Sequence, residues 1–420
     1  MATEPRKHHY VPQSILRNFS IDGERRNVFV FDKALQRSFA SPILDAGAER
    51  NFYRVHLGAE ELNYESFFDR LDCRLAELLT KVLDSESLLA LSAEERSDLA
   101  MVTACQLLRT KLQRTSPIDI ARQLAQRFQD EGMESPGSIA DSDARFLSFQ
   151  RLLDFQPIID LLASKDILLI TVRDAKLWTS DNPIVFHNNF PNGRPALAAP
   201  GVEIYYPLSS HLCLGFLCPS IKQSLEESSD SRHPMPASRD SLMLRLLKSL
   251  REQTPLESSE DYSLFLNSMQ IRQSSRFLYN SENDFKQAKQ AISKHPHLGD
   301  VQSLVTVGPM GALPPPDPRI PPGTWLHVET GNRQYMIAVG SVDESSWTID
   351  FTTTDIVKLA LVEQSAPFNC VTLIKNGQQT RMLRDVVFCH LEHKGSRFVR
   401  VQHSDAAMNT LMEKINQKTP

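Results

Sequence analysis

Seven prolines fall within residues 309–322. Proline has no backbone N–H and a fixed φ, so neither a helix nor a central strand can run through such a stretch. We therefore predict an extended linker at residues 301–322, with one domain over residues 1–300 and another over residues 323–420. The length of 420 residues agrees with this division, because it exceeds the usual size of a single domain.

The part before the prolines alternates between helical and strand patterns. Apolar residues with helical spacing predict helices at residues 62–84, 92–114, 146–163, 239–251 and 259–279. Short apolar runs predict strands at residues 27–32, 167–172, 177–179, 202–206 and 212–217. Ser92 and Glu95 have the spacing of a capping box, and polar residues predict loops at 129–145 and 222–238. The fold class expected here is a large mixed α+β domain.

The part after the prolines has strand patterns only. Alternating apolar residues predict strands at residues 325–328, 335–339, 346–351, 371–374 and 398–401. Gly331-Asn332 and Asn376-Gly377 are typical of hairpin turns. We predict a small all-β domain, either a barrel or a sandwich, and expect it to be a recognition module that contacts a protein partner or a nucleic acid.

The amino-acid composition indicates the cellular compartment of the protein and the kinds of partner that it can bind. The six cysteines form no CxxC pair, no apolar run approaches the ~20 residues of a membrane helix, and residues 1–9 are polar. We therefore expect a cytoplasmic protein with free thiols and no membrane partner. The net charge of -5 argues against wholesale electrostatic capture of nucleic acid, although the 46 Lys and Arg residues leave room for a local basic groove.

Two adjacent histidines, His8 and His9, are followed by Tyr10, Val11 and Pro12. Imidazole can hold a divalent metal ion or take a proton from water near neutral pH, and ββα-metal nucleases use a comparable pair for both purposes. The structural alternative carries about equal weight: the two side chains belong to a flexible terminus or cover a core.

A second polar group follows a predicted strand. Asp181 and Asn182 lie between Ser180 and Pro183, where the chain is expected to turn. A carboxylate at the end of a strand is a common metal ligand or catalytic acid. The alternative is that Asp181 only bonds its own backbone, which is frequent in Asp-Asn-Pro turns.

Two further pairs of polar residues lie three positions apart in apolar helical segments, so each pair occupies one helix face. The pairs are Gln106 with Arg109, and Asn267 with Gln270. If these faces are buried, the side chains must either bond one another or line a polar pocket. If they are exposed, they are ordinary solvated surface, which is the common state of such residues. Glu65, on another predicted helix, is a candidate metal ligand or a solvated carboxylate.

The order of these motifs resembles the bacterial family catalogued as domain of unknown function 4238, over residues 6–285. The motifs are Lys7-His8-His9-Tyr10-Val11-Pro12-Gln13, Leu16-Arg17-Asn18-Phe19, Val30-Phe31-Asp32-Lys33, Asn51-Phe52-Tyr53, Gln106 with Arg109-Thr110, Thr179-Ser180-Asp181-Asn182-Pro183, Tyr206-Pro207-Leu208-Ser209, and Asn267 with Gln270. The resemblance implies a shared site at His8, His9, Gln13, Asn51, Gln106, Arg109, Asp181, Asn182, Asn267 and Gln270.

The leading hypothesis is a metal-dependent nuclease or phosphodiesterase acting on DNA or RNA, which by analogy suits a bacterial toxin or defence effector. His9 is the expected general base, His8 and Asp181 the ligands of Mg²⁺, Mn²⁺ or another divalent metal ion, and Arg109 the group that neutralises the charge developing on the phosphate. The remaining polar residues are expected to line the pocket; they are Gln13, Asn51, Gln106, Asn182, Asn267 and Gln270. The alternative is a non-catalytic module that binds a nucleotide or a protein through the same residues.

Overall fold

The computed structural model describes residues 7–57, 60–133, 137–190, 195–230, 237–300, 303, 307, 316–330, 333–343, 347–350, 368–393 and 396–404. The chain divides into two compact units. The first unit lies within residues 1–187, 203–217 and 222–307, and the second within residues 188–202, 218–221 and 308–420. Most of the predicted linker, residues 301, 302, 304–306 and 308–315, lies outside the described residues.

The core of the first unit is a five-stranded sheet in the order β12-β7-β11-β10-β9. Its strands are β7 (Asp166–Val172), β9 (Val185–Asn188), β10 (Val202–Pro207), β11 (Leu212–Leu217) and β12 (Leu256–Ser258). Every residue of β10 and of β11 is buried, which explains why both strands appear in the sequence as continuous apolar runs. The strands predicted at residues 167–172, 202–206 and 212–217 are confirmed.

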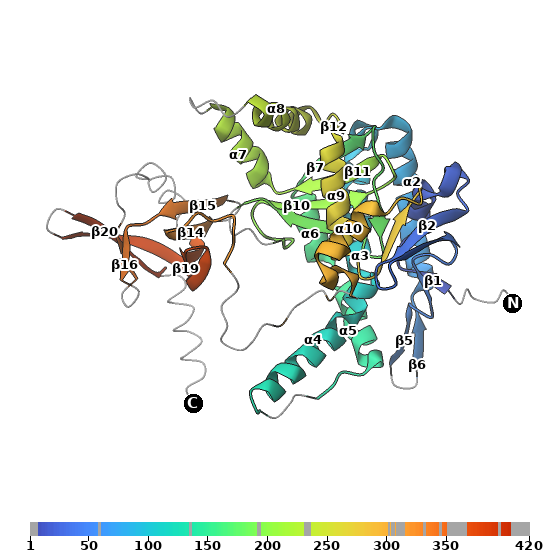
Figure 1. The fold of residues 1–420 in the computed structure, drawn as a ribbon, viewed down its shortest axis with the longest axis horizontal. Helices are drawn as coiled ribbons and strands as arrows, with labels where there is room; N and C mark the ends of the chain where they lie inside the picture. The colour runs from blue at the N-terminus through green and yellow to red at the C-terminus, as the bar shows by residue number, and fades with distance from the viewer. Residues whose placement is uncertain are drawn as a thin grey trace. The chain divides into compact units, whose positions relative to one another are not determined.

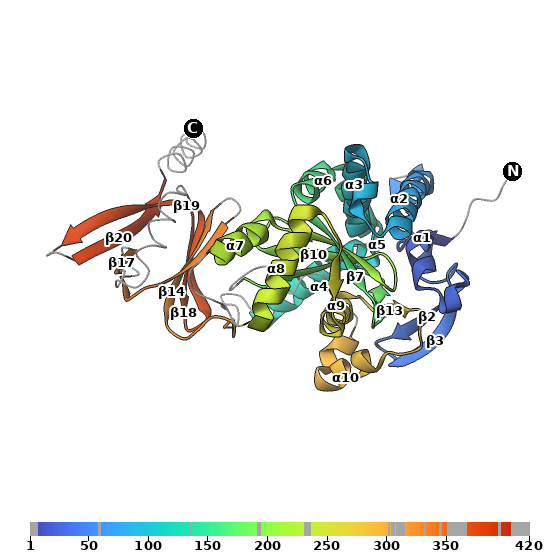
Figure 2. The ribbon, with the colours of Figure 1, turned by 90° about the horizontal axis from the view of Figure 1, so that it is seen from above.

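A second sheet of the first unit has the order β3-β2-β13-β8. It consists of β2 (Asn27–Asp32), β3 (Arg37–Pro42), β8 (Thr179–Ser180) and β13 (Phe277–Asn280). The helix predicted at residues 259–279 is therefore wrong at its end: α9 (Glu260–Gln273) stops at Ser274, and β13 follows. α9 packs beside β8, and it also lies beside α10 (Lys286–Lys294), as Figures 1 and 2 show for the two helices.

The remaining helices pack against these sheets and against one another. They are α1 (Gln13–Leu16), α2 (Glu65–Ser85), α3 (Ala93–Leu108), α4 (Lys111–Asp130), α5 (Asp141–Leu153), α6 (Gln156–Ala163), α7 (Pro219–Asp230) and α8 (Ala237–Glu252). The loop predicted at residues 222–238 is wrong where α7 occupies it, and residues 231–236 lie outside the described part. No helix among the described residues is long and apolar enough to cross a membrane.

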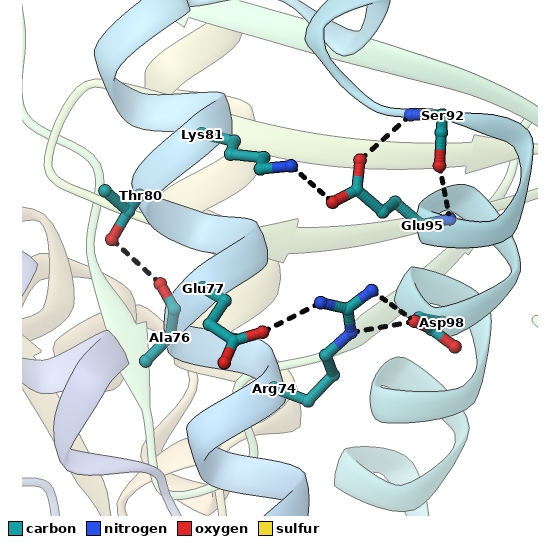
Figure 3. Close-up of polar contacts among 8 residues, drawn as sticks. All are labelled: Arg74, Ala76, Glu77, Thr80, Lys81, Ser92, Glu95 and Asp98. Carbon is teal, nitrogen blue, oxygen red and sulfur yellow. Dashed lines mark hydrogen bonds and ion pairs between the residues drawn. The ribbon is translucent and has the colours of Figure 1, made fainter.

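Helices α2 and α3 lie side by side and are tied by surface ion pairs (Figure 3). Arg74 of α2 bonds Asp98 of α3, and Lys81 pairs with Glu95. The capping box predicted for Ser92 and Glu95 is confirmed, since each side chain bonds the backbone N–H of the other. Exposed pairs of this kind are each worth at most about 1 kcal/mol, so they fix the register of the two helices more than they stabilise them.

The helix predicted at residues 92–114 is interrupted at Arg109 and Thr110. Thr110 has an extended backbone and its hydroxyl accepts a hydrogen bond from Gln113 N, which starts α4 in a new direction. Within α4, Pro117 cannot donate to the carbonyl of Gln113, and the hydroxyls of Ser116 and of Ser148 on α5 donate to it instead. The hydrogen bond from Ser148 ties α4 to α5. Arg109 and Arg114 lie on opposite sides of the break at Thr110, one at the end of α3 and the other in the first turns of α4.

The second unit contains a seven-stranded antiparallel sheet in the order β15-β14-β18-β19-β20-β17-β16. The strands are β14 (Thr324–Thr330), β15 (Arg333–Ala338), β16 (Ser341–Asp343), β17 (Thr348–Asp350), β18 (Phe368–Lys375), β19 (Gln378–His393) and β20 (Ser396–His403). β15 and β16 form opposite edges, yet Ala338 and Ser341 are only about 10 Å apart at full extension. The sheet therefore curls enough to bring one end of β15 and one end of β16 together, and the all-β unit expected from the sequence is confirmed.

One of the two hairpin turns predicted in this unit is confirmed. Asn376 and Gly377 have φ values of 50° and 80° and connect β18 to β19, as a two-residue turn requires. The other predicted turn, Gly331-Asn332, lies outside the described residues, between the paired strands β14 and β15.

Candidate functional site

Strand β1 (Lys7–His9) pairs with β4 (Ala48–Arg50) and carries the two histidines into the first unit. The carbonyl of Gly47 accepts hydrogen bonds from the N–H groups of Tyr10 and Val11. Gly47 has a φ of +61°, and a Cβ atom there would lie 2.8 Å from Cβ of Val11, so only glycine allows this approach. The position of the His-His motif thus depends on a turn about forty residues further along the chain.

The two histidines have different surroundings. His8 is 0% exposed, its ring stacks on Tyr53, and its Nδ1 accepts a hydrogen bond of 2.9 Å from Tyr53 N. His9 is half-buried, with Nε2 3.3 Å from the carbonyl oxygen of Ile43 and Nδ1 3.4 Å from Nε2 of Gln13. Burial lowers the pKa of His9, so its imidazole is uncharged at neutral pH. His8 is therefore part of the packing, while His9 keeps a basic Nδ1 with only a long contact.

Glu65, in the first turn of α2, lies next to His8. Its Oε2 is 3.4 Å from Nδ1 of His8. Burial, followed by the nearby charges of Asp69 and Asp72, raises the pKa of Glu65 to about 7, although Arg109 opposes the shift. A carboxyl group with such a pKa exchanges a proton near neutral pH, which is the behaviour of a general acid or base.

Arg109 lies at the centre of a buried chain of hydrogen bonds. Its Nε donates to Oε1 of Gln106 at 2.7 Å, and its Nη2 donates to Oδ1 of Asp72 at 2.6 Å. Gln106 in turn donates through Nε2 to the carbonyl of Tyr10 at 3.0 Å. The pair predicted on one helix face is therefore buried and not solvated, and it joins α3 to the segment that follows β1.

A small cavity lies beyond Arg109, between the β4–β5 connection, α2, α4 and α5, where β5 is Arg54–Leu57. We call it the arginine pocket. Its walls are Phe52, Tyr53, Val55, Tyr64, Phe68, Leu108, Arg109, Thr110, Arg114, Arg145, Ser148, Phe149 and Leu152, and it encloses about 30 Å³. The guanidinium carbon of Arg109 lies 5.6 Å from the ring centroid of Phe68, and that of Arg114 lies 4.2 Å from the ring centroid of Phe52. The pocket is thus an aromatic box with cationic groups in its walls.

Both arginines keep guanidinium N–H groups without a protein acceptor. Arg109 is 3% exposed and Arg114 8% exposed. Nη1 of Arg109, and both Nε and Nη1 of Arg114, have no hydrogen-bond partner among the described residues, whereas Nη2 of Arg114 donates to Glu49. Leaving a buried charged donor unpaired costs about 1–3 kcal/mol or more, so these donors favour an acceptor in the pocket. The enclosed volume is that of one or two water molecules, so it admits the terminal oxygens of a phosphate or carboxylate, which guanidinium donors match, while the rest of a ligand would lie outside.

Asp181 does not lie in this pocket. It is 2% exposed, and its two carboxylate oxygens accept three backbone hydrogen bonds, from Ser275 at 2.8 Å, Arg276 at 2.8 Å and Phe277 at 2.9 Å. Burial raises the pKa of Asp181, and these N–H groups and Lys33 oppose that shift. The carboxylate is therefore saturated by the backbone of the α9–β13 connection, and the expectation that it holds a metal ion together with His8 does not agree with the geometry.

The other three polar residues of this region form the same structural network. Asn182 donates to the carbonyl of Gln273 at 3.0 Å. Asn267 accepts from Trp178 N at 2.8 Å and donates to the carbonyl of Lys176 at 2.9 Å. Gln270 accepts from the Ser180 hydroxyl at 2.7 Å and donates to the carbonyl of Pro183 at 2.9 Å. These amides fasten the short strand β8 to α9, so they define the fold around Asp181 and do not line the arginine pocket.

Two of the expected pocket residues, Asn51 and Gln13, are not part of the lining of the arginine pocket. Asn51 is an exposed turn residue with a φ of 54°, and only its carbonyl is in contact with a pocket residue, accepting from Nη1 of Arg145 at 3.2 Å. Gln13 bonds His9 and accepts from Arg17 at 3.0 Å. The structure thus brings His8, His9, Gln13, Gln106 and Arg109 together, and places the Asp181 group elsewhere.

Among the residues that the structure describes, no three His, Cys, Asp or Glu side chains lie together as metal ligands. The described side chains therefore do not provide a set of ligands for the divalent metal ion that we expected His8 and Asp181 to bind. Two residues of the site, Asp72 and Arg114, were not predicted, because they have no distinguishing pattern in the sequence. Glu65 was predicted only as a metal ligand or a solvated carboxylate.

Comparison with known proteins gives one match. The model of the family described as "Protein of unknown function (DUF4238)" matches residues 7–284, well over half of the 420 residues. Neither the curated proteins nor the solved structures contain a significant match to this chain. The arginine pocket and the hydrogen-bond network around Asp181 both lie within the matched residues.

Proposed function

The chain belongs to the DUF4238 family of proteins of unknown function, and we propose that its family-matched part binds a phosphate-bearing ligand, a nucleotide or a nucleic-acid strand, in the arginine pocket. One observation carries this proposal: Arg109 and Arg114 both line this cavity, and three of their buried guanidinium nitrogens have no acceptor among the residues that the structure describes. Phosphate oxygens accept several such bonds at once, which a neutral ligand cannot do equally well.

The edge of the pocket supports the choice of a nucleotide over a bare phosphate. The rings of Tyr64 and Phe149 stack with centroids 3.7 Å apart, and both side chains are partly exposed. Aromatic faces beside a cationic site are what single-stranded nucleic acids and nucleotides use, since a base can stack while its phosphate is bonded. Arg145, half-buried in the wall of the same pocket, is a third cation there, and its Nε is paired with Asp141 at 2.6 Å.

The test is a binding measurement with the Arg114→Lys variant. Lysine keeps the positive charge beside Glu49 but cannot supply two further planar donors to the pocket, so we expect affinity for 5′-AMP to fall by about tenfold. Isothermal titration calorimetry measures this for the parent, for Arg114→Lys and for Arg122→Lys, the matched control on the exposed face of α4. Inorganic phosphate, adenosine and a short single-stranded RNA serve as further ligands.

The ligand series separates the possible outcomes. We expect 5′-AMP and RNA to bind more tightly than adenosine, and Arg122→Lys to behave like the parent. Equal binding of 5′-AMP and adenosine, or an affinity unchanged in Arg114→Lys, would contradict the proposal.

A second candidate function, cleavage of a bound phosphodiester, is favoured by Glu65. Its raised pKa keeps a proton available near pH 7, close enough to Arg109 for the two charges to interact. In this hypothesis a water molecule forms the new bond to phosphorus and loses a proton to Nδ1 of His9, while the bond to the leaving oxygen breaks and Glu65 gives its proton to that oxygen. Arg109 stabilises the charge on the phosphate. No step passes through a metal ion, because the side chains present do not form a fitting set of ligands.

Cleavage by this route is expected to depend on pH and on Glu65. The protonated form of Glu65 is the active one, so the rate should fall as pH rises through about 7, and Glu65→Gln should reduce it by about 100-fold or more. Labelled RNA and DNA are incubated with the parent, Glu65→Gln and the exposed control Glu131→Gln, with Mg²⁺, with Mn²⁺ and with EDTA. Cleavage that requires a metal ion and survives in Glu65→Gln would rule this assignment out.

A further inference from the structure

A second pocket of the first unit lies on the other side of the Asp181 network. It is formed by the β7–β8 connection, the start of α9 and the β13–α10 connection, and its volume is about 620 Å³. That size falls in the range of about 300–1,000 Å³ that is usual for sites of small molecules. We call it the amide pocket, after Asn280 and Gln287, two of the four side-chain amides in its wall.

Both amides present their oxygens without a partner. Asn280 is 1% exposed, and its Nδ2 donates to the carbonyl of Asp284 at 3.3 Å. Nε2 of Gln287 donates to the carbonyl of Leu264 at 2.7 Å. Because the nitrogen of each amide is held by a backbone carbonyl, the oxygen is the free end, and neither oxygen has a partner among the described residues. Two buried acceptors without a donor favour a ligand that donates hydrogen bonds.

The charges around the amide pocket select a cationic donor. Asp174, Glu260 and Glu282 line it and are exposed, and none of them forms an ion pair with another residue that the structure describes. Two cations of the lining are paired with carboxylates: Arg173 bonds Glu86, and Lys286 lies 3.7 Å from Asp284. Lys176 lies 2.9 Å from Nε2 of His211, which is no anion, so its charge offsets one of the three carboxylates. The remaining charge is therefore negative.

An aromatic wall completes the pocket. Trp178 is buried and belongs to the lining. Indole rings attract organic cations through their π face. The described His, Cys, Asp and Glu side chains form no metal-binding group here or elsewhere, which favours an organic cation over a metal ion.

We infer that the amide pocket is a binding site for a small organic amine. The protonated amino group donates to Oδ1 of Asn280 and Oε1 of Gln287, Glu260 and Glu282 balance its charge, and Trp178 packs against its carbon chain. This inference uses none of the residues of the arginine pocket and stands independently of the proposed function.

The experiment is calorimetric titration of the whole protein with putrescine, and with butanediol as a ligand of equal length that has no charge. We expect saturable binding of putrescine, and none of butanediol. Gln287→Leu removes one acceptor from a half-buried helix position and is expected to weaken putrescine binding about tenfold. Glu282→Gln, which removes one exposed carboxylate, is expected to weaken it about threefold.

Matched controls are Gln129→Leu and Glu131→Gln at the exposed end of α4, which should bind putrescine like the parent. Circular dichroism shows that each variant is folded before titration. Three results would overturn the inference: no saturable binding of putrescine, equal binding of butanediol, or unchanged affinity in both Gln287→Leu and Glu282→Gln. Displacement of putrescine by equimolar Mg²⁺ or Ca²⁺ would also overturn it, because it would assign the acceptors to a metal ion.

Discussion

Replacement of Asp181 by alanine is expected to destabilise the first unit by at least about 3 kcal/mol. Three backbone N–H groups, those of Ser275, Arg276 and Phe277, lose their acceptor, and each unpaired buried donor costs about 1–3 kcal/mol. A loss of this size is a large part of the stability of an ordinary domain, which is about 5–15 kcal/mol. Urea denaturation followed by circular dichroism measures the change.

Lys33 makes the loss larger. Its side chain is fully buried and its ammonium group donates to the carbonyls of Ile271 and Ser274. Burial lowers the pKa of Lys33 to about 8, and the charge of Asp181 opposes that shift. Without Asp181 the ammonium group is left without a nearby anion, which is costly in a buried site.

Two comparisons make the result specific to Asp181. Asp181→Asn keeps the shape and one acceptor oxygen, so we expect roughly half of the loss seen for alanine. Asp154→Ala, at an exposed position after α5, should change stability by less than about 0.5 kcal/mol. If Asp181→Ala unfolds at the same urea concentration as the parent, the carboxylate is not a structural anchor, and a functional role for it has to be considered again.

Replacement of Arg109 by methionine is expected to weaken binding of 5′-AMP by about 30-fold or more. Methionine preserves most of the packing volume against Phe68, but removes the charge and the donor that faces the pocket. A fully desolvated charge pair with phosphate is worth about 2–5 kcal/mol when one partner is removed, which corresponds to at least about 30-fold. Calorimetric titration of the folded variant measures the loss.

Asp72→Asn keeps the test decisive if Arg109→Met does not fold. Asp72 shares the guanidinium of Arg109, and it is less buried than the arginine. Removing its charge frees the arginine for a ligand, so binding of 5′-AMP should become several-fold tighter, which is the opposite sign. If Asp72→Asn also weakens binding, Arg109 acts as part of a structural ion pair and not as the ligand-binding group.

The sequence predicted the elements of the fold best where apolar periodicity is strong and uninterrupted. β7, β10 and β11 are buried on both faces and have the continuous apolar runs of such strands. The break between α3 and α4 was missed because Leu107, Leu108 and Leu112 continue the helical period across it. What ends α3 is the extended backbone of Thr110, a cap that the apolar pattern does not reveal.

Only part of the candidate site could be predicted from the sequence, because the rest depends on how distant segments pack. Local motifs identified His8, His9, Gln106 and Arg109, because paired histidines and polar residues on an apolar helix face are visible in the sequence. Whether Asp181 faces solvent or the backbone of residues 275–277 depends on how β8 and β13 pair, and turn chemistry is the same in both cases. Arg114 and Glu65 acquire their roles from burial by the β4–β5 connection and by α5, which no local pattern encodes.

The most direct test of the central claim is a crystal structure of the protein soaked in tungstate, a phosphate analogue whose anomalous signal locates it without ambiguity. We predict tungstate in the arginine pocket, with its oxygens within hydrogen-bond distance of Nη1 of Arg109 and of Nε or Nη1 of Arg114, and loss of this signal in Arg114→Lys. Ordered water on all three donors, with tungstate bound only at other places on the surface, would contradict the claim that this pocket is an anion site.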